Sequence, residues 1–117
     1  MVSPDFTKEF LTFSFAWEDT LAGVLLQKNK DGLEQPIAFF SKTLRHSELK
    51  YNTLEKQAYS LVKALKFFRI YVLHSKVIAY VPNAAIKDVL TQPDSEGKRG
   101  KWIAKIMEYD VTLSLQI

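Results

Sequence analysis

The chain has 117 residues, of which 47% are hydrophobic and 25% are charged. This length fits one domain, residues 1–117, with a single core, and this composition is typical of a globular protein and excludes a disordered chain. The formal net charge of +3 permits a polyanionic partner without requiring one.

Cysteine is absent, which excludes a disulfide framework and a thiolate metal site. The sequence contains no run of about 20 apolar residues that could span a membrane, and its first ten residues lack the pattern of a secretory signal. We therefore expect a cytoplasmic or nuclear protein with no membrane partner. The alternating pattern that reaches Gln116-Ile117 favours a domain excised from a longer polyprotein.

The first 41 residues predict an antiparallel meander of three strands. Alternating apolar and small residues predict a strand from Phe10 to Trp17, and an apolar run predicts a second from Leu21 to Lys28. A third strand is expected from Gln35 to Ser41. The sequence Asn29-Lys30-Asp31-Gly32 is typical of a hairpin turn, because its glycine accepts a positive φ.

The longest periodic stretch runs from Tyr51 to Leu73 and predicts one long helix. Apolar residues recur along it at three- and four-residue intervals, namely Leu54, Ala58, Leu61, Val62, Leu65 and Phe68. Asn52 and Glu55 have the spacing of a capping box at the start of this helix. Whether Glu55 is only a cap is the main functional question that the sequence raises.

The second half predicts shorter elements. We expect a fourth strand over Lys76–Val81, a short helix over Ala84–Leu90, a polar loop over 91–100, a helix over Lys101–Met107 and a fifth strand over Val111–Ile117. A strand, a long helix and a further strand in one sheet make the first and fourth strands parallel neighbours. The predicted fold class is α/β, a mixed five-stranded sheet with helices on its faces.

Several stretches resemble the RNase H region of gypsy-type LTR-retrotransposon reverse transcriptases. Gly23-Val24-Leu25-Leu26-Gln27 and the later Pro36-Ile37-Ala38-Phe39-Phe40-Ser41-Lys42-Thr43-Leu44 are similar to G-A-V-L-x-Q and P-I-A-Y-x-S-R-x-L of that family. Tyr51-Asn52-Thr53-Leu54-Glu55-Lys56 is similar to Y-S-x-x-E-K. This resemblance implies a ribonuclease H-like fold for the predicted five-stranded sheet.

The resemblance continues to the end of the third predicted helix. Residues 64–73 are similar to A-L-K-K-F-R-H-Y-L-L, and Gly97-Lys98-Arg99-Gly100-Lys101-Trp102 is similar to G-R-x-A-R-W, with Glu108-Tyr109-Asp110 after it. Residues 85–90 look most like plant members with degenerate active sites.

The resemblance also implies a chemistry, the cleavage of RNA in an RNA–DNA hybrid by two Mg²⁺ ions held by four carboxylates. Only Glu55 keeps a family carboxylate position. Phe15 and Pro82 occupy two of the Asp positions, and the last Asp position lies beyond Ile117. The substitute candidates are Glu18, Asp19 and Asp88, with Asn83 as a weak neutral oxygen beside Pro82.

The aromatic and basic residues have two interpretations each. We expect Phe15 and Trp17 to pack in the core, with stacking on bases as the alternative. The cations could form a solvated face or contact the phosphates of a nucleic acid; they are Lys63, Lys66, Arg69, Lys98, Arg99, Lys101 and Lys105. His46 and His74 are expected to be surface or packing residues.

The sequence therefore favours a catalytically inactive RNase H-like domain of a retrotransposon polyprotein. It would join the polymerase to downstream modules, as a connection domain does, contact an RNA–DNA hybrid or duplex, and need no cofactor. One alternative is an active ribonuclease H that uses magnesium. The other is a host-recruited module that binds a protein.

Overall fold

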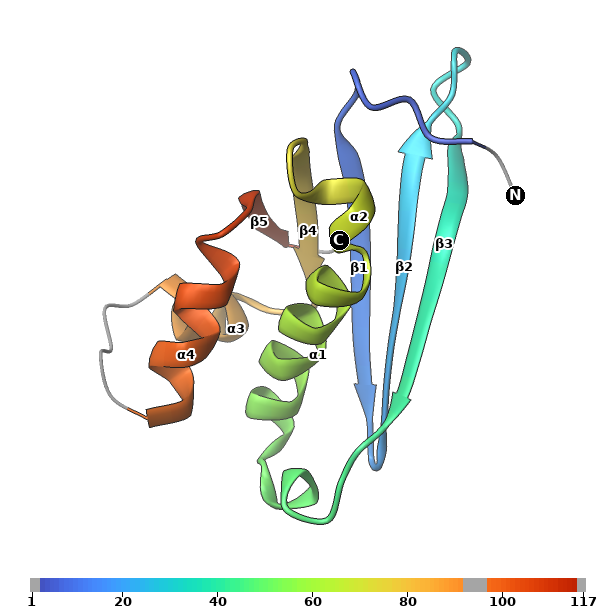
Figure 1. The fold of residues 1–117 in the computed structure, drawn as a ribbon. Coiled ribbons are helices and arrows are strands. Elements are labelled where there is room, and N and C mark those ends of the chain that lie inside the picture. The colour runs from blue at the N-terminus through green and yellow to red at the C-terminus, as the bar shows by residue number, and fades with distance from the viewer. Residues whose placement is uncertain (1–2, 92–96, 116–117) are drawn as a thin grey trace.

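The computed structural model describes the backbone of residues 3–91 and 97–115 and the side chains of residues 3–90 and 100–115. Five strands form one mixed sheet in the order β3-β2-β1-β4-β5, and the helices lie to one side of it (Figure 1). The strands are β1 (Phe10–Trp17), β2 (Thr20–Lys28), β3 (Glu34–Thr43), β4 (Lys76–Val81) and β5 (Asp110–Leu115). Among the described residues, no helix is long and apolar enough to cross a membrane.

The strand directions confirm the predicted α/β architecture. β1 pairs antiparallel with β2, and β2 pairs antiparallel with β3. β4 lies parallel to both β1 and β5. The polypeptide between β1 and β4 includes the long helix, so these two parallel strands meet through a helical crossover as expected.

The turn between β2 and β3 forms as its sequence predicts. Gly32 has a φ of 77°, and its backbone N–H donates to the carbonyl of Asn29. The Asn29 side-chain oxygen also accepts from the backbone of Asp31 and Leu33. β3 ends two residues later than predicted, because its ladder pairing with β2 continues to Thr43, which lies opposite Thr20.

The long helix is α1 (Thr53–Phe67), and it begins with the predicted capping box. The Asn52 side chain accepts from the Glu55 backbone at 2.8 Å, and a Glu55 carboxylate oxygen accepts from the Asn52 backbone at 3.1 Å. The prediction of one helix to Leu73 is wrong. The backbone leaves helical geometry at Phe68, where φ is −88° and ψ is 10°, and a short helix α2 (Arg69–Val72) follows.

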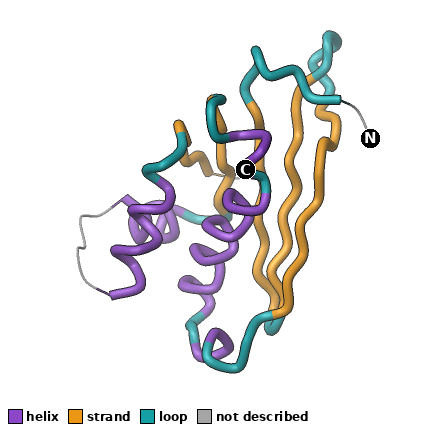
Figure 2. The backbone as a smooth tube through the Cα atoms, viewed as in Figure 1, coloured by secondary structure: helices purple, strands orange, loops and turns teal. Residues whose placement is uncertain are grey.

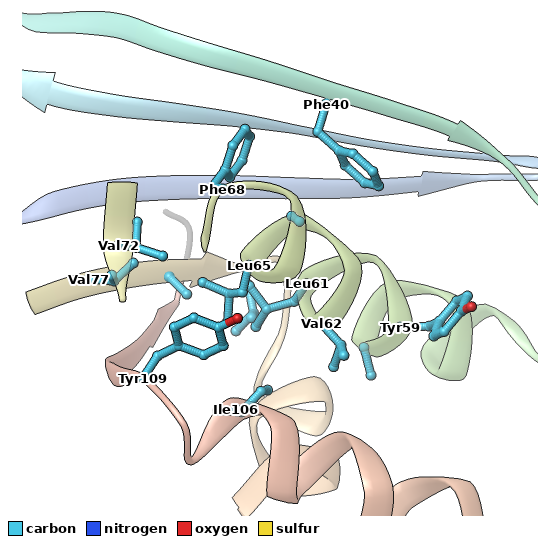
Figure 3. Close-up of a cluster of buried hydrophobic side chains, with 14 of the residues drawn as sticks. Phe40, Tyr59, Leu61, Val62, Leu65, Phe68, Val72, Val77, Ile106 and Tyr109 are labelled. Carbon is cyan, nitrogen blue, oxygen red and sulfur yellow. The ribbon is translucent and has the colours of Figure 1, made fainter. Parts of the chain in front are cut away.

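The core lies between α1 and the sheet (Figure 3). Ala58, Leu61, Leu65 and Phe68 are fully buried, which confirms the predicted apolar stripe. The helix comes close to the sheet at Gly23, where an added Cβ would lie 3.1 Å from the Cβ of Ala64. A larger side chain at this position would push α1 away from the sheet.

The remaining helices are η1 (Glu48–Lys50), α3 (Ala84–Thr91) and α4 (Gly97–Ile106). The predicted loop over 91–100 is too long, since α4 begins at Gly97; residues 92–96 lie outside the described part of the chain. α3 and α4 contact each other and α1, and α3 also contacts β4 and β5. The helices and strands therefore form two layers (Figure 2).

The sheet face opposite α1 carries no charged side chain in its three central rows. Residues paired across strands share a face, so the rows follow from the register. One row is Pro36, Leu26, Leu11, Ile78 and Thr112; the next is Phe39, Val24, Phe13, Tyr80 and Ser114; and the third contains Ser41, Ala22 and Phe15. We call this surface the open face.

Candidate functional site

The ends of β1 and β4 decide whether a carboxylate site can form. Phe13 and Tyr80 are the last pair of the parallel ladder, and Phe15 and Pro82 each follow two residues after this pair. These are the two positions that the resemblance assigns to family aspartates. Neither side chain offers an oxygen, and both residues are exposed.

The prediction that Phe15 and Trp17 pack in the core is wrong. Phe15 is 49% exposed and Trp17 is 75% exposed. The reason is the two-residue period of β1: Ser14 pairs with Gly23, which faces α1, so Phe15 and Trp17 point to the open face. A strand pattern gives the alternation, but it does not say which face a helix covers.

Glu55 lies on the helix that reaches the end of β1. Five residues further along α1, the buried Ser60 hydroxyl donates to the Phe15 carbonyl at 2.7 Å and contacts the Ala22 carbonyl at 3.3 Å. These bonds hold α1 against the end of β1. The Glu55 carboxylate participates in the capping box, where it also places negative charge at the positive end of the helix dipole.

This arrangement does not fit a two-magnesium centre. Such a centre needs several carboxylates that converge from different elements, and Phe15 and Pro82 stand where two of them would be. No group of three or more histidine, cysteine, aspartate or glutamate residues could hold a metal ion in the part of the chain that the structure describes. Glu55 is the single carboxylate at a family ligand position, because the side chains of Phe15 and Pro82 supply no oxygen.

The substitute candidates do not gather around Glu55. Glu18 and Asp19 form the turn between β1 and β2, where the Glu18 carbonyl accepts from the Lys56 ammonium at 2.6 Å. The Asp19 carboxylate accepts from the Thr20 hydroxyl, and Asp88 is exposed on α3. Asn83 caps α3, since its side-chain oxygen accepts from the Ile86 backbone at 3.2 Å.

The predicted basic residues meet along one groove between α1 and α4. This groove has a volume of about 450 Å³, and Lys63, Lys66, Arg69 and Lys101 line it together with Lys105. Glu108 is also in its wall and pairs with Arg69 at 3.3 Å and with Lys105 at 3.9 Å. The side chains of Lys98 and Arg99 lie outside the described residues.

A buried polar cluster beside this groove was not predicted. Glu48 is buried in η1, accepts a hydrogen bond from the Tyr59 hydroxyl and pairs with Lys42 at 3.6 Å. Lys63 lies over the Tyr59 ring, 5.2 Å from its centroid, and Lys42 lies 5.6 Å from the same centroid. Residues 42–50 are mostly polar, with leucines only at 44 and 49, so the sequence gave no signal that the glutamate between them would be buried.

The cluster changes the acidity of its members. Burial alone would raise the pKa of Glu48, but hydrogen bonds from Tyr59 and the Arg45 backbone, with the charge of Lys42, hold it below its usual value. Burial and the neighbouring Glu48 raise the pKa of Tyr59. Burial and the positive charges of Lys42 and Lys66 lower the pKa of Lys63. His46 and His74 are both exposed.

The parallel β1–β4 pair, the crossover helix and the sheet order define an RNase H-like protein. LC11-RNase H1, solved in complex with an RNA/DNA hybrid, shares this fold with a TM-score of 0.61; it is 14% identical, and the match covers 92% of this chain and 83% of that chain. The foamy viral protease-reverse transcriptase dRH, solved in complex with dsDNA, has a TM-score of 0.71 at 25% identity, and the match covers 96% of this chain and 20% of that chain.

The chain belongs to the family of RNase H-like domains found in reverse transcriptase, whose model matches residues 5–109. The Pol polyprotein of transposon 297 from Drosophila melanogaster is 30% identical over 106 residues, which are 91% of this chain and 10% of the relative. The Pol polyprotein of transposon opus from the same organism is 29% identical over 111 residues, 94% of this chain and 11% of the relative. The chain thus spans about a tenth of the length of these two relatives.

Proposed function

We propose that this domain is a catalytically inactive, connection-like module of a gypsy-type retrotransposon polyprotein, most similar to plant members. The positions of Phe15 and Pro82, each two residues after the last pair of the β1–β4 ladder, carry this proposal. Neither of these two side chains, at positions where the family has aspartates, carries an oxygen. The metal ions that RNase H chemistry requires would therefore have a single carboxylate ligand, Glu55.

The domain would serve as a packed spacer between the polymerase and the modules after it. Two observations support this role. The relatives are polyproteins of which the matching region is only about a tenth. Among the described residues, α1 closes the core, and no group of three or more histidine, cysteine, aspartate or glutamate residues could hold a metal ion. Loss of a hydrated carboxylate set removes mutual repulsion, which favours the stability of a domain that no longer cuts.

The same proposal includes contact with nucleic acid through the basic groove. The cations Lys63, Lys66 and Lys101 lie together there, and similar reverse transcriptases have been solved with dsDNA and with an RNA/DNA hybrid. Lysine and arginine contacts to phosphates are independent of sequence, which suits a spacer that follows the template and primer.

A hydrolysis assay with a labelled RNA–DNA hybrid and Mg²⁺ tests the inactive state. We expect no cleavage above background by the native domain. Glu55→Gln is the matched variant, because glutamine also serves in a capping box and leaves the helix start intact. Cleavage by the native domain that Glu55→Gln abolishes would contradict the proposal.

Calorimetric titration with Mg²⁺ tests the reason for inactivity. The native domain is expected to give no binding heat, whereas the double variant Phe15→Asp, Pro82→Asp should gain affinity because it adds two carboxylates just past the end of the β1–β4 ladder. Measurable Mg²⁺ binding by the native domain, as tight as that of the double variant, would show that other residues hold the metal, and the proposal would fail.

Affinity for a fluorescent RNA–DNA hybrid at several salt concentrations tests the nucleic-acid contact. Binding should weaken steeply as salt rises, since phosphate contacts release counterions. The triple variant Lys63→Gln, Lys66→Gln, Lys101→Gln should lose most of this affinity and flatten the salt dependence. Lys8→Gln, Lys28→Gln, Lys30→Gln removes equal charge elsewhere and should bind normally. No affinity at low salt would instead favour a protein-binding module.

A further inference from the structure

The groove between α1 and α4 has an apolar floor as well as a basic rim. Figure 3 shows Val62 and Leu65 on α1 facing Ile106 on α4, with Tyr109 just beyond it. The rings of Tyr59 and Trp102 complete the lining, with centroids 5.7 Å apart. These residues belong to the core that packs α4 against α1, and the groove opens above them.

The rim carries more positive charge than its own carboxylate can balance. Of the cations in the groove wall, Arg69 and Lys105 share Glu108, while Lys63 and Lys66 lie one turn apart on α1. The lowered pKa of Lys63 reports the same crowding, because burial and the charges of Lys42 and Lys66 both disfavour its protonated form. An anion in the groove would relieve this repulsion.

The concave shape decides which nucleic acid fits best. In a duplex the bases are stacked and paired inside, so phosphates could reach the rim while the floor stayed uncovered. An unpaired strand can place phosphates on the rim and a base against apolar and aromatic side chains, as single-strand binding grooves do. The volume of about 450 Å³ is within the range of sites for small organic groups of this kind.

We propose that the α1–α4 groove is a binding site for unpaired nucleic acid, with phosphates on Lys63, Lys66 and Lys101 and a base over the floor formed by Val62, Trp102 and Ile106. This rests on the proposed contact with nucleic acid and adds a preference to it.

Tryptophan fluorescence can report this contact directly, since the chain has two tryptophans on different faces. Trp102 is buried beside the groove, whereas Trp17 is exposed on the open face. The Trp17→Phe variant makes Trp102 the single reporter, and Trp102→Phe does the reverse. Oligothymidylate of about 20 nucleotides, a DNA duplex of equal length and an RNA–DNA hybrid are the probes.

We expect oligothymidylate to bind about five-fold or more tightly than either duplex at low salt, because a base adds contacts that paired strands cannot make. Binding should change the emission of Trp102 and leave that of Trp17 unchanged. The triple variant Lys63→Gln, Lys66→Gln, Lys101→Gln should abolish the change, and Lys8→Gln, Lys28→Gln, Lys30→Gln should preserve it. This lysine series keeps the test decisive if Trp102→Phe fails to fold.

The results that overturn the two proposals differ. Equal affinity for the three probes with no change in Trp102 emission would refute the unpaired-strand site while leaving the duplex contact intact. A change confined to Trp17 would move the site to the open face. Competition by a poly-glutamate peptide as effective as that by oligothymidylate would identify a site for acidic polypeptides instead. The absence of binding to any nucleic acid would refute both proposals.

Discussion

The two faces of the sheet differ in cover and in charge. α1 closes one face over fully buried residues such as Leu61 and Phe68, and its outer side forms the basic groove with α4. The open face presents aromatic side chains to solvent, including Phe39 at 60% exposure, and no charge in its central rows. The same alternating strands therefore supply the core on one side and an uncharged aromatic surface on the other.

The two faces of the sheet should contribute unequally to the stability of the domain. The α1 face buries apolar area and should account for most of the free energy of unfolding, because hydrophobic stabilisation scales with the area removed from water. The open face removes less area from water, so its aromatic residues should matter much less to folding. Substitutions chosen in pairs across the sheet can test this division.

The largest effect is expected for the buried ring of Phe68. Phe68→Ala should lower the free energy of unfolding by about 3–5 kcal/mol, since it leaves a cavity where α1 ends. Phe39→Ala on the open face is the matched control and should cost less than about 1 kcal/mol. Urea unfolding followed by circular dichroism measures both. Equal losses would show that the open face is covered in solution.

The next effect concerns the buried carboxylate beside the groove. Glu48→Gln should lower the free energy of unfolding by about 1–3 kcal/mol, because the charge-assisted bonds to Tyr59 and Lys42 are weakened in a buried setting. Glu34→Gln changes an exposed carboxylate on β3 and should be nearly neutral. Urea titration at neutral pH gives the comparison.

The pH dependence of stability follows from the same group. The folded-state pKa of Glu48 lies below its ordinary value of 4.5, so its stabilising contribution is present above that value and is lost as the pH falls through the folded-state pKa. Native protein should therefore lose stability on acidification below about pH 4.5 more steeply than Glu48→Gln. Parallel acid-limb curves for the two proteins would contradict the assignment.

A smaller effect is expected at the start of α1. Asn52→Ala should cost about 1 kcal/mol, because the Glu55 backbone N–H loses its side-chain acceptor. Glu55→Gln keeps the reciprocal bond and should cost less. Thermal unfolding of the three proteins measures the difference. A larger loss for Glu55→Gln would give the carboxylate a role beyond capping.

The smallest effect is expected for the most exposed aromatic residue of β1. Trp17→Ser should change the free energy of unfolding by no more than about 0.5 kcal/mol, since the side chain is 75% exposed. Chemical denaturation followed by circular dichroism is the measurement. A loss comparable with that of Phe68→Ala would mean that Trp17 is buried against another chain in solution.

Much of the fold could be predicted because the relevant signals are local. The capping box at Asn52 and the turn at Gly32 depend on residues within a few positions, and both formed as expected. The helix break at Phe68 was missed, because the apolar period continues through it and only packing ends the regular hydrogen bonds there. The start of α4 was missed because glycines at 97 and 100 favour a loop by propensity alone.

The candidate site was harder to predict, since it joins residues that are distant in the chain. The sequence resemblance named Phe15 and Pro82, but the β1–β4 register was needed to place both of them just past the end of one ladder. The basic residues were identified one by one, while the groove exists only because α4 packs beside α1. Glu48 gave no signal, because its burial results from the placement of η1 against Tyr59.

The sequence by itself determined the elements, the capped helix start and the absence of oxygen side chains at two family ligand positions, since these depend on residue type and short-range spacing. The tertiary structure decided which face of β1 the helix covers, and so placed Phe15 and Trp17 at the surface. It also decided that separate lysines share one groove with an apolar floor. Periodicity specifies that a strand has two faces, but only long-range packing selects the one that is buried.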